Sequence, residues 1–98
     1  MEIIKTLNGN TLTLQLNGRL DTITAPELEA VITTELEKVN ELIIDCTYLE
    51  YISSAGLRVL LSAQKMMNNK GSMKVINVND MVNEIFEITG FSEILTIE

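Results

Sequence analysis

One segment, residues 42–61, restricts the possible folds of this chain more than any other. Its first part, Leu42–Asp45, is an apolar run that is too short for a helix, lacks alternation and ends in an acid. Such a run is typical of a central strand that is covered on both faces. The second part begins a helix that we expect to extend from about Ser54 to Asn69 and to end before Gly71. A strand followed by a helix and another strand indicates a parallel sheet with right-handed crossovers.

The N-terminal part predicts an antiparallel hairpin. Two strand-like runs, residues 3–7 and 11–16, flank an Asn-Gly-Asn turn at residues 8–10. In the second run, leucines alternate with polar residues, which is the period of a strand with one buried face. Asn17 and Gly18 predict a further turn after this strand.

Two more helices and two more strands are expected. Thr24 and Glu27 have the spacing of a capping box, and apolar residues recur at three- and four-residue steps from there to Val39. The remaining elements are a strand at residues 73–78, a helix capped by Asp80 that closes at Gly90, and a short strand at residues 95–97. The predicted fold is α/β: a small mixed sheet with an N-terminal antiparallel hairpin followed by βαβα units, with helices backing the sheet.

Composition excludes several classes of protein. The 98 residues leave room for one core, so residues 1–98 are expected to form a single domain. A formal net charge of -7 with only two arginines argues against nucleic-acid binding. No apolar run approaches a membrane span, and no secretory segment begins the chain. We therefore expect a soluble, cytoplasmic monomer that does not insert into a membrane.

The chain also lacks the usual groups for metal binding and catalysis. It contains no histidine, the commonest general base and zinc ligand. Its single cysteine, Cys46, cannot form an internal disulfide or a metal cluster, and we expect it to be a small core residue in a reducing compartment. No metal site and no cofactor are predicted.

Two adjacent hydroxyls, Ser53 and Ser54, lie where the loop after Asp45 becomes a helix. A helix start has free N–H groups and a partial positive charge, so a serine there is either an ordinary cap or a place where a phosphate is tolerated. A serine hydrolase is not expected, because neither serine has a histidine or a Ser-x-x-Lys partner.

Three carboxylates, those of Asp21, Asp45 and Glu50, are candidates for one shared site near this loop. Paired acids can perform acid–base catalysis or hold magnesium. In small acidic domains such residues more often cap turns or face water, and we favour that interpretation. Gly56 alone does not form a phosphate-binding loop. The residues by themselves therefore argue against an enzyme.

Three segments of the chain resemble the STAS domain family, to which the bacterial anti-sigma factor antagonists belong. The segments are Gly18–Thr22 together with Ala25–Leu28, Ile43–Leu57, and Phe86–Phe91 followed by Leu95. They span nearly the whole chain in the family's order. The family fold, a small sheet backed by helices, agrees with the predicted order of elements.

The resemblance implies a phosphorylation site. In the family, the first hydroxyl of an Asp-Ser-Ser/Thr-Gly sequence is modified, and alignment on Gly56 places it at Ser54, with Ser53 as the second choice. This chain has Ser53 in place of the family's aspartate and Ala55 in place of the second hydroxyl. The implied partner-binding residues are Asp21, Thr22, Ser53, Ser54, Ala55, Gly56 and Leu57.

The function implied by the resemblance is partner-switching without catalysis. The unphosphorylated domain binds an anti-sigma factor, which is also its serine kinase, and this frees a sigma factor for transcription. Phosphorylation breaks the complex and a protein phosphatase restores it. The alternative is a non-catalytic STAS scaffold subunit of a membrane transport or signalling complex.

Overall fold

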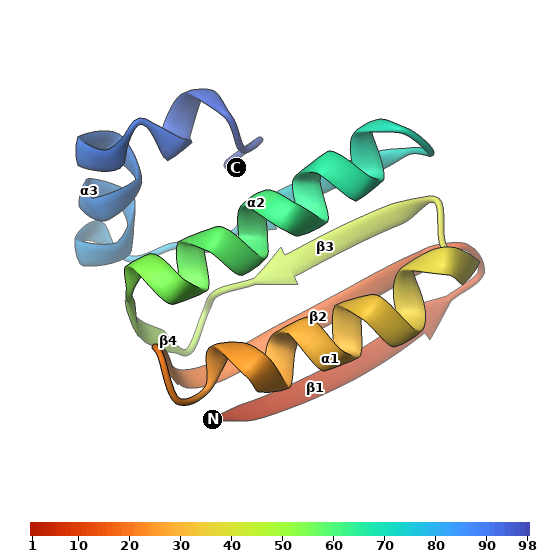
Figure 1. Cartoon of the computed structure of the whole chain (residues 1–98), viewed down its shortest axis with the longest axis horizontal. Coiled ribbons are helices and arrows are strands. Elements are labelled where there is room, and N and C mark those ends of the chain that lie inside the picture. Colours follow the sequence, from red (N-terminus) through yellow and green to blue (C-terminus); the bar gives the residue numbers. More distant parts are fainter.

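A mixed sheet with two helices across one face forms the centre of the protein in the computed structural model, which describes residues 1–98 (Figure 1). The strands follow the order β1-β2-β3-β5, and the short β4 pairs with the far end of β2. The strands are β1 (Glu2–Asn8), β2 (Thr11–Leu20), β3 (Glu41–Asp45), β4 (Leu49–Ile52) and β5 (Ser72–Ile76). The helices are α1 (Ala25–Glu35), α2 (Ser54–Asn68) and α3 (Asp80–Thr89), with short 3-10 turns at Leu36–Lys38 and Phe91–Glu93.

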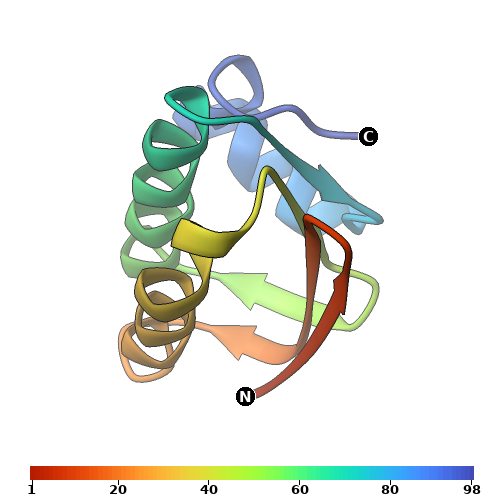
Figure 2. The same cartoon turned by 90° about the vertical axis from the view of Figure 1, so that its right-hand side faces the viewer.

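The predicted fold class is confirmed. Strands β1 and β2 form the antiparallel hairpin, and β2, β3 and β5 pair in parallel. Figure 2 shows α1 and α2 together on one side of the sheet, with their axes side by side. Both helices begin at the same end of the molecule, where β2 and β4 end (Figure 1).

The predicted turn at Asn17 and Gly18 is wrong, because β2 continues through both residues to Leu20. The first half of β2 pairs with β3 and its second half pairs with β4, and the register shifts between Gly18 and Arg19. Gly18 has φ 109°, a conformation that glycine adopts without steric cost. The glycine therefore allows the strand to change partners instead of ending it.

Strand β4 was not predicted from the sequence. It contains four residues, of which Glu50 is exposed and Tyr51 is half-buried, so it has no continuous apolar run. Strand β4 forms because it pairs in parallel with the second half of β2, a segment that is distant from it in the sequence.

The central position of β3 is confirmed, but its covering on both faces is not. Leu42 and Ile44 are fully buried under the helices, whereas Ile43 points to the opposite face and is only half-buried. With α1 and α2 on the same side, the second face of the sheet is not covered by them (Figure 2). Because the helices cover only one face of the sheet, half-buried and buried residues alternate along β3. Five residues were too few for this alternation to be recognised in the sequence.

The predicted helices are present with small changes at their ends. Helix α1 ends at Glu35, earlier than expected, although Leu36 and Val39 beyond it are still buried. Helix α2 begins at Ser54 as predicted, and α3 is closed by Gly90, which has the left-handed conformation expected of a C-terminal cap.

The cap of α3 is Asn79 and not Asp80. The Asn79 side chain accepts a hydrogen bond from Val82 N–H at 2.8 Å, which satisfies one free amide of the first turn. The final strand expected at residues 95–97 is reduced to a single parallel bridge between Val75 and Ile97.

Candidate functional site

The start of α2 is fixed by the ends of two strands. Leu20 of β2 pairs with Ile52 of β4, and Ser53 N–H donates to the Leu20 carbonyl at 2.9 Å, which extends the pairing by one residue. Ser53 has an extended backbone, and Leu57 N–H donates to its carbonyl at 2.9 Å as the first turn of α2 forms. The chain therefore changes from strand to helix between Ser53 and Ser54.

The two serine hydroxyls lie in different environments. Ser54, the first residue of α2, is exposed. The Ser53 hydroxyl oxygen is sealed from solvent and has no hydrogen-bond partner, and it does not cap the helix. The ordinary capping bond considered for this position is therefore not formed. An enzyme that modifies a serine needs access to its oxygen, and of these two serines only Ser54 is exposed.

Gly56 lets the first turn of α2 approach the sheet closely. A Cβ atom at this position would lie 2.6 Å from Leu20 Cγ and 2.9 Å from Ile52 Cγ1, distances that packed atoms do not tolerate. The next residue, Leu57, is 5% exposed. Gly56 and Leu57, two of the expected partner-binding residues, are buried, and they support the exposed residues beside them.

The loop between β2 and α1 is held by Asp21. Its Oδ1 accepts hydrogen bonds from Ile23 N–H at 3.0 Å and Thr24 N–H at 3.1 Å. The backbone bond from Thr24, with further bonds from Ile23 and the Thr24 hydroxyl and the charge of Arg19, holds the pKa of Asp21 below its usual range. Asp21 therefore shapes this loop.

Thr24 does not act through the predicted capping box. Its hydroxyl donates to the Arg19 carbonyl at 2.7 Å, and its backbone is helical rather than extended. Because these bonds fix the loop, the Ile23 side chain projects outward with 84% of its surface exposed. Ile23 could not be identified from the sequence, since exposure of an apolar residue has no local signature.

A groove of about 400 Å³ separates the first turns of α1 and α2 beside Ser54. Its lining residues are Thr22, Ala25, Pro26, Glu29, Ala55, Arg58 and Val59. The structure thus brings Thr22 and Ala55, two of the partner-binding residues implied by the family resemblance, to a common surface. Arg58 was missed, although its position four residues after Ser54 places the two on one helix face.

Arg19 borders the same end of the sheet. Its guanidinium carbon lies 4.5 Å from the centre of the Tyr51 ring, and its Nε lies 3.8 Å from Asp21 Oδ2. These contacts join β2, β4 and the loop before α1. Arg19 is consequently engaged by its own chain.

The three candidate carboxylates do not form one site. Asp45 pairs with Gln15, six residues before Asp21 along β2, so the two acids lie at different levels of the sheet. Although burial opposes it, hydrogen bonds from Thr47, Asn77 and Gln15 lower the pKa of Asp45 below its usual range. The structure contains no group of three or more acidic, cysteine or histidine side chains that could hold a metal ion.

Cys46 follows β3 and is confirmed as a core residue, 1% exposed. Burial, reinforced by the charge of Asp45, raises the pKa of the Cys46 thiol to about 12. The thiol is therefore neutral at physiological pH and poorly suited to act as a nucleophile.

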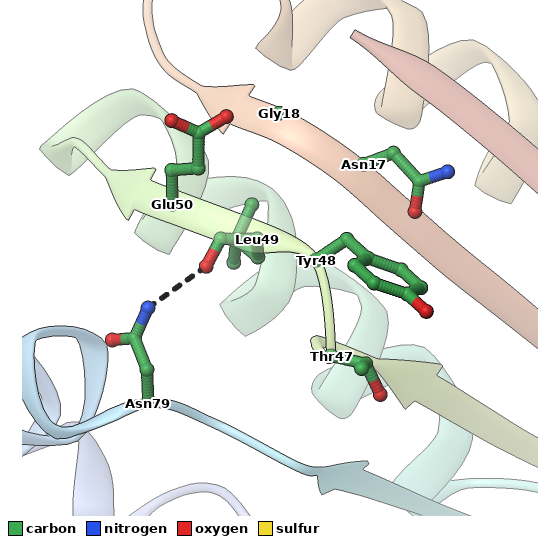
Figure 3. A pocket seen from close by; sticks show the side chains of 7 residues that line it. All are labelled: Asn17, Gly18, Thr47, Tyr48, Leu49, Glu50 and Asn79. Carbon is green, nitrogen blue, oxygen red and sulfur yellow. Dashed lines mark hydrogen bonds between the residues drawn. The ribbon is translucent and has the colours of Figure 1, made fainter.

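Glu50, the third carboxylate, lies at a second cleft of about 590 Å³ (Figure 3). The cleft is lined by Asn17, Gly18, Thr47, Tyr48, Leu49, Glu50 and Asn79. Asn79 Nδ2 donates to the Leu49 carbonyl at 3.0 Å, so the residue that caps α3 also attaches that helix to β4. Neither serine lines this cleft.

No helix in the structure combines the length and apolar character needed to cross a bilayer.

Comparison with known proteins gives a consistent result. The STAS domain family matches residues 2–98. BtrV of Bordetella bronchiseptica, which carries the name of an anti-sigma factor antagonist, is 36% identical over 84 residues, or 84% of this chain and 72% of that protein.

Solved structures share the fold at lower sequence identity. An anti-sigma factor antagonist from Mycobacterium paratuberculosis has a TM-score of 0.87 at 20% identity, covering 98% of this chain and 83% of that one. The phosphorylated form of the Bacillus protein SpoIIAA has a TM-score of 0.78 at 18% identity, covering 99% of this chain and 91% of that one. Because the family match extends over almost every residue, this chain belongs to the STAS domain family.

Proposed function

We propose that this protein is an anti-sigma factor antagonist whose binding to an anti-sigma factor is controlled by phosphorylation of Ser54. The exposure of Ser54 at the start of α2, next to a Ser53 oxygen that is sealed from solvent, carries the proposal. The name of BtrV supports the general function, and the solved phosphorylated form of SpoIIAA supports the mode of control.

The domain itself tolerates the phosphate. Phosphoserine adds roughly -1.5 to -2 charges at pH 7. At the N-terminus of a helix, attraction to the dipole offers about 0.3–1 kcal/mol of stabilisation, so the fold is expected to change little. A serine kinase, which is the anti-sigma factor itself, adds the phosphate and a phosphatase removes it.

The complex with the anti-sigma factor does not tolerate the phosphate on Ser54. A partner that covers Ser54 would have to bury the added charge, and an uncompensated buried charge costs several kcal/mol. Since about 1.4 kcal/mol corresponds to a tenfold change in affinity, modification releases the partner. The contact surface consists of Thr22, Ile23, Ser54 and Ala55 around the groove, while Asp21 maintains its loop. The protein acts by binding and has no catalysis of its own.

Titration of four purified forms against the ATPase-type anti-sigma factors of the source organism tests the proposal. Ser54→Asp should bind at least about tenfold more weakly than wild type, because it adds part of the charge of a phosphate. Ser54→Ala should keep wild-type affinity and accept no phosphate. Ser53→Ala is the matched control and should be phosphorylated normally.

Mass spectrometry after incubation with the kinase and ATP locates the phosphate. Phosphate on Ser53, or equal affinity of wild type and Ser54→Asp, would refute the proposal. Absence of phosphate together with co-purification of transport subunits would instead assign the protein to the alternative role of a STAS scaffold.

A further inference from the structure

Helix α2 carries a charge opposite to that of the protein as a whole. The chain has a formal net charge of -7, and both other helices carry three acidic residues and no basic one. Helix α2 contains no acidic residue at all, and its charged side chains are Arg58 and Lys65. The exposed residues Ser54, Arg58, Ser62 and Lys65 follow one another at steps of four, four and three. This spacing places them on one helix face, the basic stripe of α2.

The two cations of the basic stripe are not used within the protein. The three ion pairs in the structure engage Lys5, Arg19 and Lys74, and Lys70 donates to the Leu36 carbonyl. Glu29 lines the groove across from Arg58 without forming an ion pair with it. Arg58 and Lys65 are both exposed and are therefore available to a binding partner.

We infer that the basic stripe of α2 docks against an acidic face of the protein partner. The partner's class rests on the proposed function, whereas the charge of its contact face follows from α2. A partner with an acidic face is repelled by most of this domain's surface and attracted by this stripe. Complementary charges of this kind orient the encounter of two proteins and raise its rate.

The position of Ser54 at the head of the basic stripe links docking to control. The formal charge of the stripe is +2, from Arg58 and Lys65. A phosphoserine carries roughly -1.5 to -2 charges, which cancels nearly all of it. It also lies one helical turn from Arg58, within reach of an attractive i,i+4 interaction. Phosphorylation therefore removes the attraction to an acidic face in addition to obstructing the contact.

Binding of the purified anti-sigma factor to Arg58→Gln, Lys65→Gln and the double variant tests the inference. Lys38→Gln is the matched control, because Lys38 is exposed, forms no ion pair and lies outside α2. At low salt each α2 variant should bind roughly threefold more weakly and the double variant roughly tenfold, as expected for exposed charge pairs. Raising the salt concentration should weaken the binding of the anti-sigma factor to wild type more than its binding to the double variant.

A second measurement needs no natural partner. A short poly-L-glutamate peptide is added to isotope-labelled protein, and the amide signals are followed by NMR. The largest shifts should belong to α2 between Ser54 and Lys65 and should disappear in the double variant, while circular dichroism confirms an unchanged fold.

The outcomes separate the two proposals. Equal affinity of the double variant and wild type for the anti-sigma factor would overturn the basic stripe as a docking surface and leave the proposed function intact. Peptide shifts on α2 without binding of any anti-sigma factor would support the stripe and refute the proposed function. Shifts spread evenly over the surface, or binding of anionic vesicles in place of protein, would also overturn the inference.

Discussion

Gly56 connects the packing of the core to the surface that carries Ser54. In an isolated helix, replacing glycine by alanine is stabilising by roughly 0.5–1 kcal/mol. At this position the added methyl would meet Leu20 and Ile52, which are both fully buried and cannot move aside without displacing other core residues. The steric cost should therefore exceed the gain in helix propensity.

Gly56→Ala is expected to lower the free energy of unfolding by about 1–3 kcal/mol, the usual cost of inserting a methyl group into a packed core. Urea unfolding followed by circular dichroism measures the change. Ser62→Ala, an exposed substitution in the same helix, is the control and should stay within about 0.5 kcal/mol of wild type. A more stable Gly56→Ala protein would show that α2 has room to shift.

Among single residues, the exposure of Ile23 and the burial of the Ser53 hydroxyl oxygen could not be predicted from the sequence. Both depend on where a backbone turn directs a side chain. A residue's own chemistry does not determine that direction. The position of Ser54 at a helix start was predictable, since the loop before it and the apolar period after it are local signals.

Helix α3 illustrates how an element is attached through its cap. Asn79 accepts from Val82 N–H and donates to the Leu49 carbonyl at 3.0 Å, so one side chain both starts the helix and joins it to β4. Asp80, the neighbouring residue, is the first residue of the helix and contributes only its charge near the helix dipole.

Asn79→Ala should therefore cost about 1–2 kcal/mol of stability, because two partly buried backbone groups lose their partner. Asp80→Ala should cost only a few tenths of that, about 0.3 kcal/mol. Thermal unfolding of the two variants side by side measures the difference. A larger loss for Asp80→Ala would restore the cap assignment made from the sequence.

Strand β2 shows where element boundaries escape prediction. Asn-Gly is among the strongest turn signals in a sequence, yet Asn17 and Gly18 lie within a continuous strand. The signal was correct in one respect, since the backbone at Gly18 does have a positive φ. The positive φ at Gly18 lies where β2 stops pairing with β3 and begins to pair with β4. Only the assembled sheet requires this change of partner.

The whole molecule should lose stability in acid through two carboxylates. Hydrogen bonds from Thr24 lower the pKa of Asp21. Burial raises the pKa of Asp45, but hydrogen bonds from Thr47 and Asn77 outweigh this effect, and the pKa of Asp45 is lowered. A carboxyl whose pKa is depressed by folding stabilises the native state when ionised. That contribution is present above the pKa of the unfolded chain and is lost as the pH falls through the folded pKa.

The free energy of unfolding should accordingly fall as the pH drops below about 4, near the ordinary pKa of aspartate. Asp45→Asn should flatten this dependence, because its amide no longer titrates. Urea unfolding between pH 2 and pH 7, values chosen to span roughly the range in which carboxylates titrate, measures both profiles. Glu50→Gln, which also removes one negative charge, is the control, and an unchanged slope in Asp45→Asn would disprove the role of Asp45.

The sequence by itself determined the type and order of the main elements. Hydrophobic period, turn residues and length identify the hairpin, the parallel strands β3 and β5 and the three helices, because these signals are local. It also determined the position of Ser54 at a helix start and the exclusion of histidine chemistry. The family resemblance drew on the same local segments.

Only the tertiary structure decided how these elements form a surface. It paired β4 with the end of β2, left one face of the sheet uncovered by α1 and α2, separated Asp45 from Asp21, and placed Arg58 beside the groove. Each of these features depends on contacts between segments far apart in the chain. The free energy of such contacts comes from packing and burial in three dimensions, which the local sequence does not encode.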